Sequence, residues 1–240
     1  MREFVYVSDG KLSTFLPEPR RFSRPAAIRL STPVGGLDVE AAAADAERAR
    51  LQRLKRVDQH LNDKALWFTE PNLRPGQWVW FEAPLHCVTP RGTYQHMVLF
   101  SDPAPGEDPQ HERATGCRLL MHGSARHLLG QAPVDVEGLP LEGIDGGSSV
   151  GTTFLTSAGR VMQALSLEHD PVAVDVPAPA TDLRGGGVRD LLAALDARHG
   201  QVGSAARVYG YAKVTADLPA TADAPRCVVA SPLTVEYAHD

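Results

Sequence analysis

Residues 81–87, FEAPLHC, and residues 229–235, VASPLTV, are the two stretches on which the predicted fold rests. Each is an apolar run of strand length with a small residue, a proline and a leucine at its centre. Proline cannot donate to a β-ladder, so inside a strand it belongs at an edge or a bulge. The shared pattern predicts the same bend in one strand of each half of the chain.

A second pair of segments strengthens the impression of a repeat. Residues 5–12, VYVSDGKL, and 119–126, LLMHGSAR, each run from an apolar strand into a small polar turn. Self-similarity of this kind indicates two related units. We therefore predict an α+β protein of two ferredoxin-like halves, each strand-helix-strand-strand, over residues 1–115 and 116–240. Their mainly antiparallel sheets would pack into one core, and the longer second half would carry extra helices.

The remaining elements follow from periodicity and from turn residues. Apolar residues at helical spacing predict a long helix over Asp38–Asn62. Residues 77–88 read as a strand that pairs with Thr93–Ser101 across a turn at 90–92, and residues 102–116 read as a polar loop. Further helices are expected at about 152–167 and 187–199, and two closing strands at 207–215 and 227–237.

Composition excludes several classes of protein. The chain is 43% hydrophobic with a net charge of −5, so it is not disordered and lacks the basic excess of a nucleic-acid or anionic-membrane binder. No apolar window reaches the ~20 residues of a membrane span, and no signal peptide is expected. Three cysteines without a CxxC pair favour a reducing compartment, which we take to be the cytoplasm.

One helix face is nevertheless basic. Acidic neighbours stand at helical spacings from these side chains, so we expect a solvated, salt-bridged face and no nucleic-acid partner. A nucleic-acid binder remains the alternative, with binding that weakens steeply with salt. The basic residues are Arg48, Arg50, Arg53, Lys55 and Arg56.

The candidate catalytic group lies at the polar turn of the second half. His122, Ser124 and His127 place a hydroxyl and two imidazoles where a strand enters a helix, a position that can present a nucleophile. The segment is not a GxSxG elbow, and Ser124 could equally cap the following helix. Arg126 adds a cation for ligand binding.

The first half offers candidate ligand-binding residues at the corresponding turn. Ser8, Asp9 and Lys11 follow its first strand. If the halves are equivalent, the two polar turns could line one shared pocket. We expect no cofactor, because the glycine-rich segments 146–151 and 185–187 match neither a Walker loop nor a dinucleotide-binding fingerprint.

The predicted hairpin gives two more candidates. A turn at 90–92 puts His86 opposite His96, with Cβ atoms about 4.5–5.5 Å apart. Two imidazoles need a third ligand to hold zinc, and Glu82 lies too far along the strand, so we assign them to ligand binding and predict no metal.

The tryptophans are interpreted as core. Trp67, Trp78 and Trp80 cluster around a strand that is apolar on both faces. Such a strand is expected to be buried on both faces, so packing is favoured over base stacking.

The opening FVYVSDGKLSTFL, the central WFEAPLHCVTPRG and the closing VVASPLTVEYA resemble an uncharacterised actinobacterial family of about this length. The resemblance implies no activity. With no motif complete, we expect a non-catalytic sensor or accessory module of a bacterial cytoplasmic system that binds a small molecule or a protein, with a homo-oligomer left open. The alternative is a small hydrolase-like or transferase-like enzyme that uses the 122–127 cluster.

Overall fold

The computed structural model describes residues 3–15, 37–90, 96–130, 134–136, 186–197 and 204–238. The predicted helix at about 152–167, the glycine-rich segment 146–151, residue 185 of the segment 185–187, and the turn residues 91–92 lie outside this part. The chain divides into two compact units, residues 1–7 with 65–240, and residues 8–64. No helix of the described residues is long and apolar enough to cross a membrane.

The smaller unit consists of two helices, α1 (Asp9–Phe15) and α2 (Leu37–Asn62). The predicted long helix is confirmed almost to the residue. Leu54, Val57 and Leu61 follow one another at helical spacing and are at most 3% exposed, which accounts for the periodicity read from the sequence. Arg50 donates to Asp9 at 3.1 Å, so one residue of the basic face is paired within this unit.

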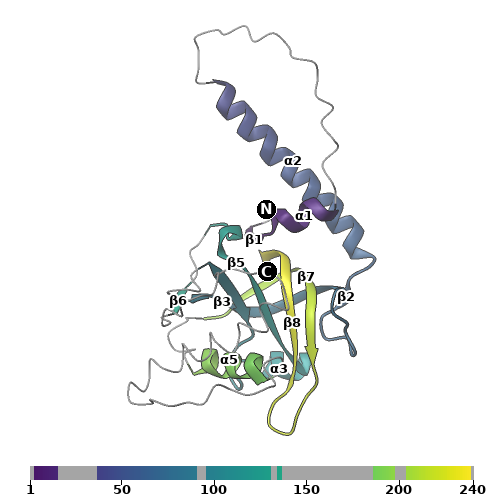
Figure 1. Cartoon of the computed structure of the whole chain (residues 1–240), viewed down its shortest axis with the longest axis vertical. Coiled ribbons are helices and arrows are strands. Elements are labelled where there is room, and N and C mark those ends of the chain that lie inside the picture. The colour runs from purple at the N-terminus through teal and green to yellow at the C-terminus, as the bar shows by residue number, and fades with distance from the viewer. Residues whose placement is uncertain are drawn as a thin grey trace. The chain divides into compact units, whose positions relative to one another are not determined.

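The larger unit is organised around a closed barrel of five strands (Figure 1). In ring order these strands are β3–β4–β5–β8–β7, with β7 returning to β3. Every neighbouring pair is antiparallel except β5 and β8, which are parallel. The five are β3 (Trp78–Pro90), β4 (Met97–Ser101), β5 (Cys117–Ser124), β7 (Ala206–Leu218) and β8 (Arg226–Tyr237).

Three short strands extend this sheet. β1 (Phe4–Val7) runs antiparallel beside the end of β8, and β2 (Leu66–Trp67) and β6 (Val134–Val136) run parallel beside β3. The prediction of two ferredoxin-like halves is therefore wrong. The reason lies in β3, which pairs with β7 over residues 78–85 and with β4 over 86–88, so the ring joins strands from both predicted halves.

The two strand prolines lie where their missing N–H groups cost least. Pro232 stands at a bulge of β8, and it falls between the residues that pair with β5 and those that pair with β1. Pro84 pairs with Arg207 on one side and lies outside the β4 pairing on the other. The edge-or-bulge prediction is confirmed for both prolines, but the bends are not equivalent.

Strand alternation separates the barrel interior from its outer face. Val79, Phe81, Ala83 and Leu85 of β3 point inward and belong to the central core. Helix α5 (Gly186–Asp196) packs on the outer face of β4, β5 and β8. That second layer joins four α5 residues to apolar strand residues: Val188, Leu191, Leu192 and Leu195 with Met97, Leu99, Leu120 and Val229.

Candidate functional site

A short helix, α3 (Pro109–Thr115), lies in the segment that was predicted to be a loop. The Asp108 carboxylate accepts from the backbone N–H of His111 at 3.0 Å, and Pro109 occupies the first turn, where its missing N–H is not needed. Gly116 ends the helix in the left-handed conformation at φ 62°. The spacing of Asp-Pro and Gly in the sequence was the signal that could have found this helix.

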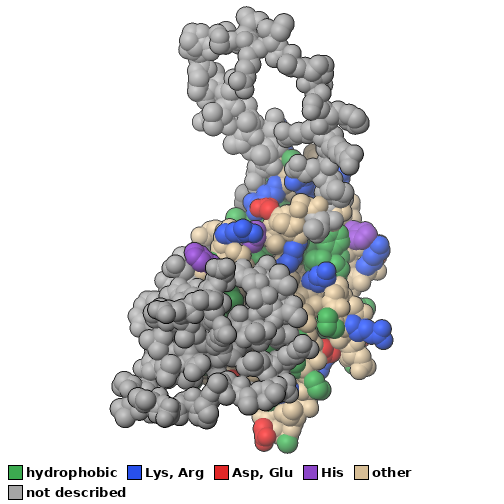
Figure 2. All heavy atoms as spheres, viewed as in Figure 1, with side chains coloured by type: hydrophobic (Ala, Val, Ile, Leu, Met, Phe, Trp, Pro, Cys, Tyr) green, Lys and Arg blue, Asp and Glu red, His purple; other side chains and the backbone are tan. Residues whose placement is uncertain are grey.

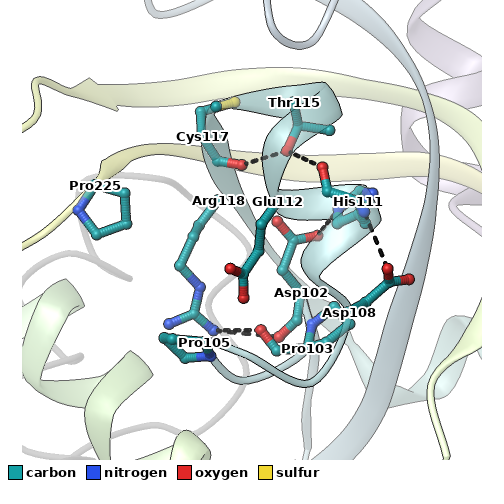
Figure 3. Close-up of a pocket in the computed structure, with 11 residues that line it drawn as sticks. Asp102, Pro103, Pro105, Asp108, His111, Glu112, Thr115, Cys117, Arg118 and Pro225 are labelled. Atoms are coloured by element: carbon teal, nitrogen blue, oxygen red, sulfur yellow. Dashed lines mark hydrogen bonds and ion pairs between the residues drawn. The ribbon is translucent and has the colours of Figure 1, made fainter.

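Hollows lie on two sides of α3. The first, here called the inner pocket, has a volume of about 200 Å³ and is drawn in Figure 3. The second, here called the outer cleft, has a volume of about 370 Å³ and lies between α3 and the outer face of β3 and β7. Asp108, His111 and Thr115 line both, so α3 is the wall that the two hollows share.

His111 is held from behind by a buried carboxylate. Asp102, which is 4% exposed, accepts from the backbone N–H of Leu119 at 2.7 Å, and its other oxygen lies 3.3 Å from Nε2 of His111. The hydrogen bond to Asp102 raises the pKa of His111, and burial partly opposes this. Burial raises the pKa of Asp102, against the effects of His111, the Leu119 N–H and Arg118. A carboxylate behind an imidazole sets the orientation of its ring.

Arg118 fixes the floor of the inner pocket. Its guanidinium forms a two-pronged ion pair with Asp196 of α5, at 2.7 and 2.8 Å. It also donates to the carbonyl oxygens of Asp102 and Pro103, each at 3.2 Å. Bidentate pairs of this kind are strong and directional. One side chain therefore ties β5, α5 and the loop before α3 together.

The walls of the inner pocket are acidic and proline-rich. Figure 3 shows the carboxylate of Glu112 directed into the space beside Arg118, with Pro103 and Pro105 at its border. The positive charge of Arg118 is already balanced by Asp196.

Burial raises the pKa of the Cys117 thiol to about 11, so this thiol is protonated near neutral pH and is no nucleophile.

The predicted catalytic residues do not line either hollow. His122 is fully buried and Ser124 is 9% exposed, and both lie within β5, where they pair with Leu99 and Met97. The predicted polar turn is strand, because pairing with β4 continues through these residues. His127 lies in the turn η2 (Ala125–His127).

The ligand-binding candidates are also dispersed. The His127 ring meets Tyr6 edge-on with ring centroids 5.7 Å apart, and the guanidinium of Arg126 lies 3.3 Å from Nε2 of His127. Ser8, Asp9 and Lys11 belong to the smaller unit, at the start of α1. The polar turns of the two halves are thus different structures, one preceding a helix and the other part of a strand.

The predicted pairing of the two hairpin histidines is wrong. His86 pairs with Ser101, because β4 begins only at Met97 and the register is displaced from the predicted one. The backbone carbonyl of His96 instead accepts from Ala125 at 2.8 Å. His86 lies 3.2 Å from the carboxylate of Glu107 and borders a cavity of about 10 Å³ beside Asp102. Of the predicted site residues, it lies nearest the candidate site.

None of the tryptophans is fully buried in the barrel core, although Trp67 is partly buried and packs against it. Even-numbered residues of β3 point outward, since the odd-numbered ones fill the interior. Trp80 is 44% exposed, and its ring centroid lies 4.1 Å from that of Trp67. The prediction failed for Trp80 because the described residues cover the outer face of β3 only in part.

The strand order defines the fold, and a family model defines the family. Counting only barrel strands, the ring order is 1-2-3-5-4-1 with strands 3 and 5 parallel, which is the arrangement of the OB-fold. The chain belongs to the Family of unknown function (DUF7019), whose family model matches residues 2–239. No curated protein and no solved structure matches the chain significantly.

The Asp102–His111 pair predicts a specific pH dependence. A histidine whose pKa is raised by folding contributes stability below its unfolded pKa of about 6.5, and this contribution is lost as the pH rises through the folded value. We therefore expect the free energy of unfolding of the wild type to fall as the pH rises above about 6.5, and to fall less in His111→Gln. Urea denaturation across this range measures both, and equal slopes would contradict the coupling.

Proposed function

We propose that this chain is a ligand-binding module, without catalysis of its own, that takes a small molecule in the outer cleft. The observation that carries the proposal is the cleft wall at His111, whose ring is held by the buried Asp102. A volume of about 370 Å³ falls within the range of roughly 300–1,000 Å³ for small-molecule sites.

The covering of the barrel supports this choice of site. OB-folds bind oligonucleotides and oligosaccharides on the face of their second and third strands. Here those strands are β4 and β5, and α5 packs its apolar side chains on their outer face. Among the described residues, the outer face of β3 and β7 borders the cleft against α3 and is accessible to a ligand.

The rigidity of the walls also favours binding. Helix α3 is capped at both ends, and the loop before it is held by Arg118 and Asp102. A preformed site avoids much of the entropic cost of ordering its walls when the ligand arrives. We also propose that the chain works in a reducing compartment, the cytoplasm, and its three unpaired cysteines support this.

The enzyme alternative has less support. His122, Ser124 and His127 line no hollow in the described part of the chain, whereas general acid-base catalysis needs groups that converge on one. The enzyme alternative therefore stays a prediction that no pocket of the described residues supports.

Filling the cleft tests the proposal. Ala114 lies on an exposed position of α3 and lines the cleft, so Ala114→Trp should occupy the cleft without disturbing the core. In a thermal-shift screen against uncharged and charged metabolites, a ligand at 100 times its Kd should stabilise the wild type by about 2.7 kcal/mol, or roughly 5–10 °C. We expect Ala114→Trp to abolish the shift.

Ala222→Trp is the matched control. Ala222 is an exposed alanine of the loop between β7 and β8 and lines neither hollow. Its variant should keep the ligand-induced shift of the wild type. A shift that survives in Ala114→Trp would place the ligand elsewhere and contradict the proposal.

A further inference from the structure

The outer cleft opens beside an unusual aromatic surface. All three tryptophans of the chain lie on β2 and on the outward positions of β3. Trp67 lines the cleft, and Trp80, its neighbour across the strand pair, is 44% exposed. A group of large apolar side chains that stays exposed to solvent often marks a binding surface.

The cleft is lined by side chains with planar hydrogen-bonding groups: a guanidinium, a carboxylate and an amide. Arg207 donates to one carboxylate oxygen of Glu82 through Nε at 2.9 Å and through a terminal nitrogen at 2.8 Å. Both side chains remain accessible, at 65% and 40% exposure. A guanidinium has five N–H donors, so Arg207 keeps donors for a ligand. Gln110 adds an amide from α3.

The charge balance of the cleft argues against an anionic ligand. Glu82 and Arg207 compensate one another, the Asp108 carboxylate caps α3, and among the described residues no lysine or second arginine lines the cleft. Phosphate-bearing ligands need an excess of basic groups. On the described surface that Figure 2 shows, basic side chains stand among hydrophobic and neutral ones. A purely apolar ligand would leave the polar groups of the cleft without hydrogen-bond partners, and this would cost binding free energy.

The two walls of the cleft carry different kinds of side chain, and this difference favours one class of uncharged ring as the ligand. Trp67 supplies an aromatic wall, whereas Ala114 and Thr115 of α3 supply a wall of small side chains. A flat heterocycle would favour aromatic surfaces on both sides. A sugar ring has one face of C–H groups, which carry partial positive charge and suit the negative face of an indole. Its hydroxyls both donate and accept, as Arg207, Gln110 and Glu82 require.

From these observations, and resting on the proposed function of the cleft, we infer that its ligand is an uncharged sugar ring, either a single pyranoside or the terminal ring of a short oligosaccharide. The ring stacks on Trp67, and its hydroxyls bond the Glu82–Arg207 pair. Trp80, which pairs with Trp67 and is 44% exposed, offers a surface on which a second ring can extend along the outer face of β3.

The test uses the full chain and defined probes. Neutral methyl pyranosides and di- and trisaccharides are screened on a glycan array, and hits are titrated by tryptophan fluorescence and calorimetry. Uncharged nucleosides and inorganic phosphate are titrated in parallel. We expect a neutral sugar to bind, with affinity falling at least tenfold in Trp67→Ala and in Arg207→Gln. Trp67→Phe should keep most of the affinity, which separates lost stacking from lost folding.

Lys213→Ala is the matched control, because Lys213 is exposed on the same outer face of β7 but does not line the cleft. The affinity of the Lys213→Ala variant for the sugar should stay within twofold of that of the wild type. Sugar binding that is unchanged in Trp67→Ala and Ala114→Trp overturns the inference. Binding of a nucleoside or phosphate but no sugar, abolished by Ala114→Trp, also overturns it while leaving the proposed function intact. Absence of binding by every probe and metabolite overturns both.

Discussion

Gly210→Ala is expected to destabilise the barrel by more than about 3 kcal/mol, above the roughly 1–3 kcal/mol of ordinary overpacking. Gly210 lies in β7 opposite Phe81 and Val235. A Cβ atom there would overlap the backbone carbonyl of Thr234 and lie 3.2 Å from the Phe81 ring. Backbone cannot rotate away as a side-chain end can, so β7 and β8 would have to separate.

Urea denaturation, followed by circular dichroism, measures this loss. Gly10→Ala is the control, because a Cβ at Gly10, inside α1, meets nothing within 4 Å. Alanine is the better helix former by about 0.5–1 kcal/mol, so this control should be neutral or slightly stabilising. A Gly210→Ala variant with a wild-type unfolding midpoint would show that the two strands do not approach as closely as described.

Asp102→Ala is the second substitution with a large expected effect, a loss of about 3–5 kcal/mol. It removes the acceptor for the buried N–H of Leu119 and the partner of His111 in one step. A buried donor left without an acceptor carries its full desolvation cost. Because Asp102 also anchors the wall shared by the pocket and the cleft, ligand affinity should fall with stability.

Asp102→Asn separates charge from hydrogen bonding. The amide oxygen still accepts from Leu119, and burial already disfavours the charged form of Asp102, so the loss should be smaller than in the alanine variant. Hydrogen exchange at the Leu119 amide reports the bond directly. Adding Asp102→Ala to the His111→Ala variant should cost less stability than Asp102→Ala costs in the wild type. The effects of substitutions within one hydrogen-bond network are not additive. Equal losses for Asn and Ala would contradict the acceptor role.

Local sequence signals predicted most elements correctly. The α2 helix, the strands β7 and β8, and α5 all lie close to their predicted ranges, because each depends on periodicity within a short window. The prolines at 84 and 232 were correctly assigned to an edge or a bulge. Helix α3 was missed although its Asp-Pro cap and its terminal glycine are local, since its seven residues leave no room for an apolar period.

The candidate site was predicted only in part. His86 was singled out and lies beside Asp102, but for a pairing with His96 that the register does not allow. Asp102 and His111 were passed over as members of a polar loop. The link from Arg118 to Asp196 spans 78 residues, and no sequence pattern shows which carboxylate a distant guanidinium will meet.

The sequence by itself determined the strands, the helices, the acidic balance and the unpaired cysteines, because each depends on residues close in the chain or on simple counts. The tertiary structure alone decided that the strands form one closed barrel and that α3 stands between two hollows. Alternation within a strand states which residues share a face, but not which strand lies beside it. That choice is made by long-range pairing, here of β3 with both β4 and β7.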